Sequence, residues 1–192
     1  MEFKALVSSE VENNYISEIK TRNLDDLPKG KVLIKVNFSS LNYKDALSAI
    51  GNKGVSRNYP HTPGIDAAGI VEFSETDKYK KGDEVIVTGY DLGMNTSGGF
   101  SEFVRVPEAW VVKKPSEISL SETMALGTAG LTAGLCVRKL LNHGIKPEMG
   151  KLFVTGATGG VGIVAMMLLS KLDFEVTAVT GKMDSEELLK KY

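Results

Sequence analysis

The chain has 192 residues, 42% hydrophobic and 24% charged, the proportions of an ordinary globular protein with one or two domains. Its net charge of −1, without basic clusters, argues against nucleic acid as a partner. Charges interrupt the N-terminal segment MEFKALVSSEVENN, which excludes a signal peptide, and no uninterrupted apolar stretch reaches membrane-spanning length. We therefore expect a cytoplasmic protein without a membrane partner.

Short β-rich segments dominate residues 1–120. They are separated by Gly, Pro, Asp and Asn, which favour turns over strands. The predicted strands are Phe3–Ser8, Lys31–Phe38, Gly69–Phe73, Glu84–Thr88, Phe100–Val106 and Trp110–Lys113. This spacing of short strands predicts a compact β-barrel or sandwich.

Helical sequence begins near residue 120. Ser119 is the predicted N-cap, and Glu122 takes the reciprocal position of a capping box. The helix is expected to run to about Asn142, with a glycine break around residues 127–130 and an end at Gly144 and Pro147. Cys136, the single cysteine, excludes an intrachain disulfide and fits a reducing cytosol. Its apolar helical neighbours predict a buried thiol.

Residues 151–162, KLFVTGATGGVG, form the most informative motif. The run Leu152–Thr155 predicts a buried strand, residues 162–172 predict a helix, and Glu175–Thr180 predicts a second strand. A strand, a glycine-rich turn, a helix and a parallel strand form the unit that binds a dinucleotide. A tight turn in any α/β protein is the alternative interpretation of the glycines alone.

The glycines of this motif have separate expected roles. Gly159 and Gly160 let the backbone approach a pyrophosphate, and the helix N-terminus supplies N–H groups and a partial positive charge. Gly162 lets the helix pack closely against the strand. The turn therefore predicts a dinucleotide cofactor.

The end of the second predicted strand indicates which cofactor is bound. NAD-binding domains usually place an acidic residue here, about 20 residues beyond the glycines, to bind the ribose 2′-hydroxyl. This chain has Thr180, Gly181 and Lys182 instead. A hydroxyl, an N–H group and an ammonium would bind the 2′-phosphate that a carboxylate repels. Asp184, with Glu187 three residues on, is predicted to be a helix N-cap. The sequence therefore predicts NADPH.

Six segments resemble the medium-chain dehydrogenase/reductase superfamily. They are SLNYKDA (40–46), PGIDAAGIV (63–71), KGDEVI (81–86), GGFSEFV (98–104), GTAGLTA (127–133) and ATGGVG (157–162). They are most similar to the zinc-free, YhdH/YhfP-type quinone oxidoreductases, which include acrylyl-CoA reductases. The resemblance implies a GroES-like β-barrel domain at residues 1–120, followed by the first part of an α/β Rossmann dinucleotide-binding domain at residues 121–192. Because relatives continue further, the chain is expected to be a fragment of an enzyme that is a homodimer when full length.

The resemblance also bears on metal binding. Zinc-dependent relatives carry ligands at the positions that Asn42, Ile65 and Thr128 occupy in this chain. An isoleucine cannot bind a metal, and asparagine and threonine are poor matches for zinc. The two histidines, His61 and His143, are expected to be loop or cap residues. We therefore predict no metal.

The resemblance places Tyr43 beside the nicotinamide, where its phenol would donate a proton or its ring would form a wall of the pocket. Asn42 is expected to hydrogen-bond the substrate or the cofactor amide. Asp45 completes the predicted catalytic set, although a structural carboxylate that holds Lys44 or a backbone turn is the favoured alternative, and Asp66 is interpreted as structural. The predicted cofactor-binding residues are Tyr43, Thr128, Thr158, Gly159, Gly160, Val161, Thr180, Gly181 and Lys182.

The expected reaction follows from the absence of a Lewis acid, without which alcohol oxidation loses its usual stabilisation of an alkoxide. Reduction by NADPH of an activated C=C bond or a quinone suits the site better, with an enoyl-CoA or a quinone as substrate. Lys53 and Arg57 could contact an anionic CoA tail, but solvated loop charges are the favoured alternative. A 2-enoyl thioester reductase, an alcohol dehydrogenase-like protein and a non-catalytic binding module stay open as other functions.

Overall fold

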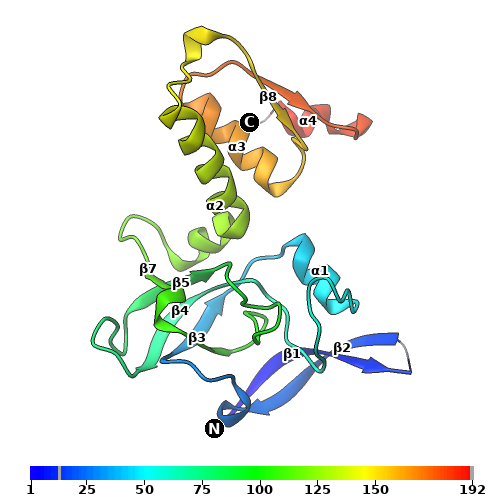
Figure 1. Cartoon of the computed structure of the whole chain (residues 1–192), viewed down its shortest axis with the longest axis vertical. Helices are drawn as coiled ribbons and strands as arrows, with labels where there is room; N and C mark the ends of the chain where they lie inside the picture. Colours follow the sequence, from blue (N-terminus) through cyan, green and yellow to red (C-terminus); the bar gives the residue numbers. More distant parts are fainter. Residues whose placement is uncertain (13, 191–192) are drawn as a thin grey trace. The chain divides into compact units, whose positions relative to one another are not determined.

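The computed structural model describes residues 1–12 and 14–190, which divide into two compact units (Figure 1). Unit 1 is Met1–Gly127 and unit 2 is Thr128–Tyr192. The division falls within α2 (Leu120–Asn142), where Gly127 has φ 48° and ψ −151° and breaks the helix. A positive φ of this kind is readily adopted only by glycine. The predicted glycine break is therefore confirmed.

Unit 1 is built from antiparallel strands (Figure 1). A hairpin joins β1 (Glu2–Val11) to β2 (Asn14–Asn23). A five-stranded sheet has the order β6 (Phe103–Val106), β3 (Val32–Phe38), β4 (Asp66–Ser74), β5 (Glu84–Thr88) and β7 (Val111–Lys113). Short helices lie between the strands: η1 (Leu24–Asp26), α1 (Tyr43–Ala49) and η2 (Glu108–Trp110).

The core of unit 1 consists mainly of β-branched side chains, which pack well on a pleated sheet. Val32, Ile34, Val71, Val85 and Val104 are among its fully buried members. A second cluster, with Phe3, Leu33 and Phe103, packs the hairpin against the sheet. Consecutive buried residues at Val32–Ile34 in β3 and at Asp66–Gly69 in β4 show that these parts of the sheet are covered on both faces.

Unit 2 contains one strand–helix–strand crossover. β8 (Leu152–Thr155) pairs in parallel with β9 (Val176–Val179), and α3 (Gly160–Lys171) connects them. The unit also contains η3 (Pro147–Met149), η4 (Met183–Ser185) and the short α4 (Glu186–Leu189). Val137 of α2 packs with Leu169 and Phe174 in its core. This is the strand, turn, helix and parallel strand that residues 151–180 predict, but the predicted burial of β8 is wrong, since Phe153 is 69% exposed.

Several local predictions are confirmed. The capping box exists as two reciprocal hydrogen bonds: the Ser119 N–H donates to Glu122 at 2.7 Å, and the Glu122 N–H donates to the Ser119 hydroxyl at 3.2 Å. α2 ends at Asn142, as expected. The sequence did not predict β2 or α1.

Two further predictions are wrong. Cys136 is exposed, because it lies on a side of α2 that the core of unit 2 does not cover. Asp184 is not an N-cap, since it lies inside η4 and the following helix begins at Glu186 with Ser185 in the cap position. α2 is long and apolar enough to cross a membrane by length and composition, a test that core helices also pass. Its Leu120 and Met124 pack against Ala68 in unit 1.

Tyr79 in the β4–β5 loop gives a stability prediction. Its side chain is buried, and its hydroxyl donates to the carbonyl of Val111 on β7. Tyr79→Phe leaves this buried carbonyl without the hydroxyl donor and should lower the free energy of unfolding by about 1–2 kcal/mol, measured by urea denaturation. Tyr90→Phe is the matched control, because Tyr90 donates to the Ala109 carbonyl from an exposed position. Equal losses in the two variants would contradict a role for the buried bond.

Candidate active site

The predicted site residues fall into two groups, each described within its own unit. Asn42, Tyr43 and Asp45 belong to unit 1 and lie at the start of α1. The remaining cofactor-binding candidates belong to unit 2, where most of them lie on the turn after β8 or at the end of β9.

The start of α1 is fixed by a side chain inside the helix. Asn42 is the N-cap residue, with φ −121° and ψ 156°, and its backbone N–H donates to Asp45 Oδ2 at 2.7 Å. An acidic side chain three residues after the cap satisfies a donor that the helix leaves free. This hydrogen bond therefore fixes the backbone where the helix begins, at Tyr43.

The other oxygen of Asp45 ties α1 to the start of β4. Asp45 Oδ1 accepts hydrogen bonds from the backbone N–H groups of Gly64 at 3.1 Å and Ile65 at 2.9 Å. The side chain is 2% exposed. Burial raises the pKa of Asp45, and the hydrogen bonds from Asn42 and Ile65 oppose that rise. Asp45 thus holds a backbone turn, the structural alternative that the sequence favoured over a catalytic role.

Asp66 is a second buried carboxylate beside the first. Its Oδ2 accepts a hydrogen bond from Asn42 Nδ2 at 2.9 Å and another from the Ser40 hydroxyl. Asn42 Nδ2 also lies 3.2 Å from Ser40 Oγ. Because Asp66 Oδ2 and Ser40 Oγ are hydrogen-bonded to each other, both lie on one side of Asn42 Nδ2, where one of its two amide protons can reach them.

Gly127 closes this polar cluster. A Cβ atom at Gly127 would lie 2.7 Å from Asp66 Oδ2 and 2.8 Å from Ser40 Oγ, both too close for a real side chain. The break in α2 is thus required by the approach of its backbone to the carboxylate. The sequence did not single out Ser40, although it lies in the quoted SLNYKDA segment.

Tyr43 is largely exposed in the structure. Its side chain is 81% accessible, and within the described residues its hydroxyl has no hydrogen-bond partner. Leu41 beside it is 89% accessible. An exposed apolar pair next to a buried polar cluster is the composition expected of a ligand-binding surface.

The candidate metal positions have other structural roles. Asn42 binds Asp66, and Ile65 is buried. Among the described residues, no three His, Cys, Asp or Glu side chains are grouped so that they could hold a metal ion. His61 is buried with Nε2 2.9 Å from the Gly93 carbonyl, and burial lowers its pKa. His143 Nδ1 lies 2.8 Å from the Lys139 carbonyl at the end of α2.

The two loop cations differ in their surroundings. Lys53 Nζ contacts Glu10 Oε2 at 3.1 Å and lies over the ring of Tyr59 at 4.7 Å from its centroid, so this ammonium is occupied. Arg57 is exposed, and only its backbone N–H is bound, to Asn95 at 3.3 Å, among the contacts of the described residues. Arg57 is therefore the better candidate for an anionic tail.

The glycine turn of unit 2 has the geometry of a phosphate cradle. α3 begins at Gly160 with Gly159 as its cap and no side-chain cap hydrogen bond. The first N–H groups of a helix cannot bond within it, so those of Gly160, Val161 and Gly162 stay available. A Cβ at Gly162 would lie 2.3 Å from the Gly156 carbonyl oxygen, which shows why the sequence needs glycine there.

The end of β9 lies next to this turn. The Ala157 N–H donates to the Val179 carbonyl at 3.3 Å, and the hydroxyls of Thr158 and Thr180 are 3.5 Å apart. The Lys182 N–H donates to Thr180 Oγ1 at 3.1 Å. Thr180, Lys182, Glu186, Leu189 and Lys190 line a hollow of about 410 Å³. Lys190 is paired with Glu186 at 2.7 Å, whereas in the described part of the chain Lys182 has no carboxylate within 4.0 Å.

Comparisons with known proteins agree with this architecture. The alcohol dehydrogenase GroES-like domain matches residues 28–116. YhfP of Bacillus subtilis, assigned as a quinone oxidoreductase, is 45% identical over 98% of this chain and 57% of its own length. The acrylyl-CoA reductase AcuI of Ruegeria pomeroyi is 43% identical over 97% of the chain and 57% of its own length.

Solved structures give the same result. The yhdH oxidoreductase from Salmonella enterica in complex with NADP has a TM-score of 0.95 and 41% identity, and the match covers 100% of this chain and 58% of that one. The chain thus carries an alcohol dehydrogenase GroES-like domain and is similar over nearly all of its length to quinone oxidoreductases and acrylyl-CoA reductases. Its predicted fold, a GroES-like domain followed by the start of a Rossmann-like domain, is confirmed. The chain spans slightly more than half the length of these relatives.

Asp45 supplies a stability prediction for the site. Asp45→Ala removes the acceptor of two buried N–H groups, those of Gly64 and Ile65, and should lower the free energy of unfolding by about 2–4 kcal/mol. Asp25→Ala, a change of an exposed carboxylate, is the control and should have little effect. Denaturant titration of the two variants measures the difference. A loss no larger than that of the control would show that Asp45 does not hold the turn.

Proposed function

We propose that this chain carries the substrate-side and cofactor-side residues of an NADPH-dependent oxidoreductase that reduces an activated C=C bond or a quinone by hydride transfer without zinc. The observation that carries the proposal is the end of β9. An unpaired Lys182 ammonium and the Thr180 hydroxyl lie where many NAD-binding domains have a carboxylate. Tyr43, exposed and unbonded among the described residues, supplies the group for the substrate side.

The glycine turn supports binding of a dinucleotide. The close approach of Gly162 to Gly156 brings the start of α3 against the end of β8. The free N–H groups at this helix end, with the positive end of the helix dipole, suit a pyrophosphate. Thr158, Gly159, Gly160 and Val161 are proposed to contact it.

The end of β9 supports NADPH over NADH. Lys182 would pair with the 2′-phosphate, and Thr180 and Gly181 would complete the contact. A relative from Salmonella enterica was solved with NADP, whereas the Bacillus subtilis relative yhfP was solved with NAD. Both cofactors therefore occur among relatives of more than 40% identity. The preference proposed for this chain therefore rests on its own residues at the end of β9.

The residues of unit 1 have distinct proposed tasks. NADPH, when bound, supplies a hydride to an electrophilic carbon. The Tyr43 hydroxyl donates a proton to the substrate, and the Asn42 Oδ1 atom accepts a hydrogen bond from the cofactor or substrate amide. Asp66 and Ser40 orient the Asn42 side chain through its Nδ2 group.

The substrate class follows from the same surface. The names of the relatives indicate a quinone for YhfP and acrylyl-CoA for AcuI. For this chain we propose a small quinone or an enoyl-CoA, with Arg57 available for the phosphate of a CoA tail. We also propose a cytoplasmic location and a homodimer in the complete protein. A 2-enoyl thioester reductase stays as a second enzyme class, and a non-catalytic binding module stays as the alternative without chemistry.

Cofactor selection gives a test that needs no turnover. Lys182→Glu should weaken NADPH binding by about ten- to a hundred-fold, the value of a charged hydrogen bond to phosphate, and leave NADH binding nearly unchanged. Calorimetric titration of each cofactor measures the two affinities. Salt should weaken NADPH binding more than NADH binding in the unmutated chain.

Lys146→Glu is the matched control, since Lys146 is an exposed lysine of the same unit away from β9. It should leave both affinities unchanged. Equal affinity of the unmutated chain for the two cofactors, or equal weakening of both by Lys182→Glu, would mean that the phosphate is not recognised here.

The proton-donor role of Tyr43 gives a test of chemistry. Tyr43→Phe should lower kcat with acrylyl-CoA or a small quinone by about a hundred-fold, a usual contribution of a general acid. Tyr90→Phe, which alters another exposed tyrosine, is the control. A Tyr43→Phe enzyme with nearly normal kcat would assign the ring to the pocket wall instead. Faster turnover of a simple alcohol than of any enone, quinone or acyl-CoA would refute the reaction class.

A further inference from the structure

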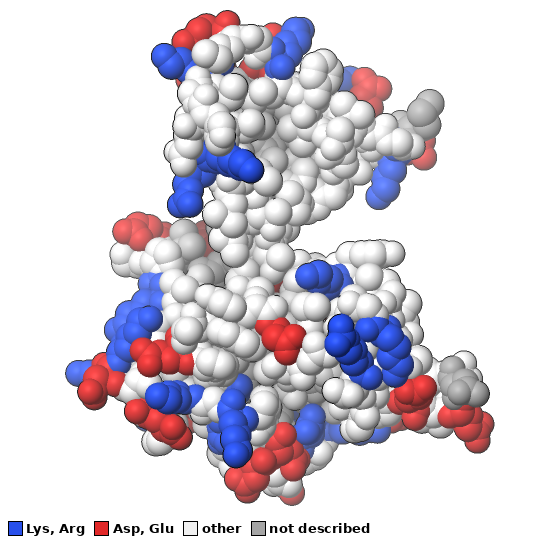
Figure 2. All heavy atoms as spheres, in the orientation of Figure 1, with Lys and Arg blue, Asp and Glu red and all other residues white. Residues whose placement is uncertain are grey.

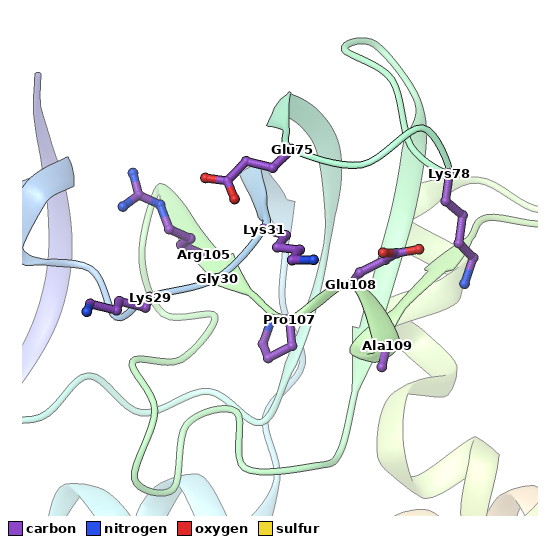
Figure 3. A pocket seen from close by; sticks show the side chains of 9 residues that line it. All are labelled: Lys29, Gly30, Lys31, Glu75, Lys78, Arg105, Pro107, Glu108 and Ala109. Atoms are coloured by element: carbon purple, nitrogen blue, oxygen red, sulfur yellow. The ribbon is translucent and has the colours of Figure 1, made fainter.

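A charged pocket lies at the end of the unit 1 sheet opposite the candidate active site. Its lining residues are Lys29, Gly30, Lys31, Glu75, Lys78, Arg105, Pro107, Glu108 and Ala109, around a hollow of about 860 Å³ (Figure 3). Lys31 immediately precedes β3, whereas Ser40 and Asn42 follow its other end. At about 3.3 Å per residue, the strand between them separates the two sites by about 20 Å.

The position of the pocket follows from the strand register. Val32 pairs with Val106 of β6 and with Ser74 of β4, so the segments that precede β3, follow β6 and follow β4 meet at one end of the sheet. Arg105 comes from β6, and Glu75 comes directly after β4. The cations of the pocket are thus contributed by three separate segments rather than by one basic run, which explains why the sequence did not show them as a cluster.

The rim is held in place by backbone contacts. The Glu75 N–H donates to the Lys31 carbonyl at 2.9 Å, and the Trp110 N–H donates to the Pro107 carbonyl at 3.1 Å. A Cβ at Gly30 would lie 2.6 Å from the backbone of Val106, so glycine is needed for this segment to reach β6. The pocket is therefore preformed, which reduces the entropic cost of binding.

Its charges are unpaired. In the described part of the chain, Lys29, Lys31, Lys78 and Arg105 have no carboxylate within 4.0 Å, although many other lysines on this unit are paired. Figure 2 shows that Lys and Arg side chains are mixed with Asp and Glu over the drawn face of unit 1. Lys78 Nζ lies over the ring of Tyr79, 5.2 Å from its centroid, but none of the four cations is neutralised by a carboxylate, so the hollow would attract an anion.

The pocket also presents hydrogen-bond acceptors. In Figure 3, side chains of alternating charge follow one another across the view: Arg105, Glu75, Lys31, Glu108 and Lys78. Glu75 and Glu108 would repel a simple anion but would accept hydrogen bonds from hydroxyl or amino groups. Acidic residues bind ribose hydroxyls in this way in dinucleotide-binding domains. A nucleoside phosphate carries both kinds of group, and the hollow falls within the range of about 300–1,000 Å³ usual for small-molecule sites.

We propose that this pocket binds a nucleoside phosphate, with the phosphates at Lys31 and Arg105 and the ribose hydroxyls at Glu75 or Glu108. The site is separate from the glycine turn of unit 2, and the proposal does not rest on the proposed reaction.

The test follows backbone amide signals in nuclear magnetic resonance spectra of the whole chain during a titration with ADP. Saturable shifts are expected at Gly30, Lys31 and Arg105, and they report the pocket separately from any shifts at Gly159 and Val161. ADP should bind the pocket more tightly than pyrophosphate, and adenosine should bind least. Saturable ADP shifts at Gly159 and Val161 without shifts at the pocket would overturn this proposal and leave the cofactor site standing.

The double variant Lys31→Gln with Arg105→Gln should weaken the binding that the pocket amides report by about tenfold or more, without affecting the glycine turn. Lys35→Gln with Lys171→Gln removes two exposed charges elsewhere and is the matched control. Equal effects of the two double variants would show non-specific charge attraction and overturn the proposal. So would equal affinities for ADP and pyrophosphate.

Discussion

Two buried carboxylates determine where the candidate substrate-side residues lie. A buried carboxylate is tolerated only where hydrogen-bond donors replace the water it has lost. Asp45 meets this requirement with the N–H groups of Asn42, Gly64 and Ile65, and Asp66 meets it with side chains that follow β3. These donors come from the end of β3, the start of α1 and the start of β4. The carboxylates therefore join three segments, and the exposed ring of Tyr43 takes its place from that junction.

The candidate cofactor-binding residues of unit 2 are positioned in a different way, because the turn after β8 contains no carboxylate. Glycines let the backbone of α3 approach β8, and the Gly162 position leaves no room for a methyl group. The helix end that results has unpaired donors rather than acceptors, so it suits an anion. The Thr158 and Thr180 hydroxyls lie at the same edge, beside Lys182. The buried carboxylates of unit 1 are thus satisfied internally, whereas the donors at the unit 2 turn are left open.

The features predicted from sequence are those that depend on neighbours in the chain. β8 has its predicted bounds, and the Ser119–Glu122 capping box is present, because four consecutive residues suffice for each. β2 was missed because most of its side chains are exposed, so it lacks the alternation that marks a half-buried strand. Asp66 was interpreted as structural, but its link to Asn42 across 24 residues has no local signal. The charged pocket at Lys31 and Arg105 was missed for the same reason, since strand register alone brings its segments together.

The hydrogen bonds of Asn42 restrict how the proposed reaction is assisted. An amide offers two protons and one acceptor atom, and in this structure Asp66 and Ser40 hold the Nδ2 group of Asn42 from one side. This contact fixes the amide, so Asn42 does not turn freely toward negative charge that develops on a substrate oxygen. In a reduction, that charge develops as the hydride arrives and needs a donor. Among Asn42, Tyr43 and Asp45, Tyr43 carries the exposed donor without a partner in the described residues, whereas Asp45 is buried as an acceptor of backbone N–H groups. The proton-donor role proposed for Tyr43 therefore follows from the exposure of its phenol and from the fixed positions of Asn42 and Asp45 beside it.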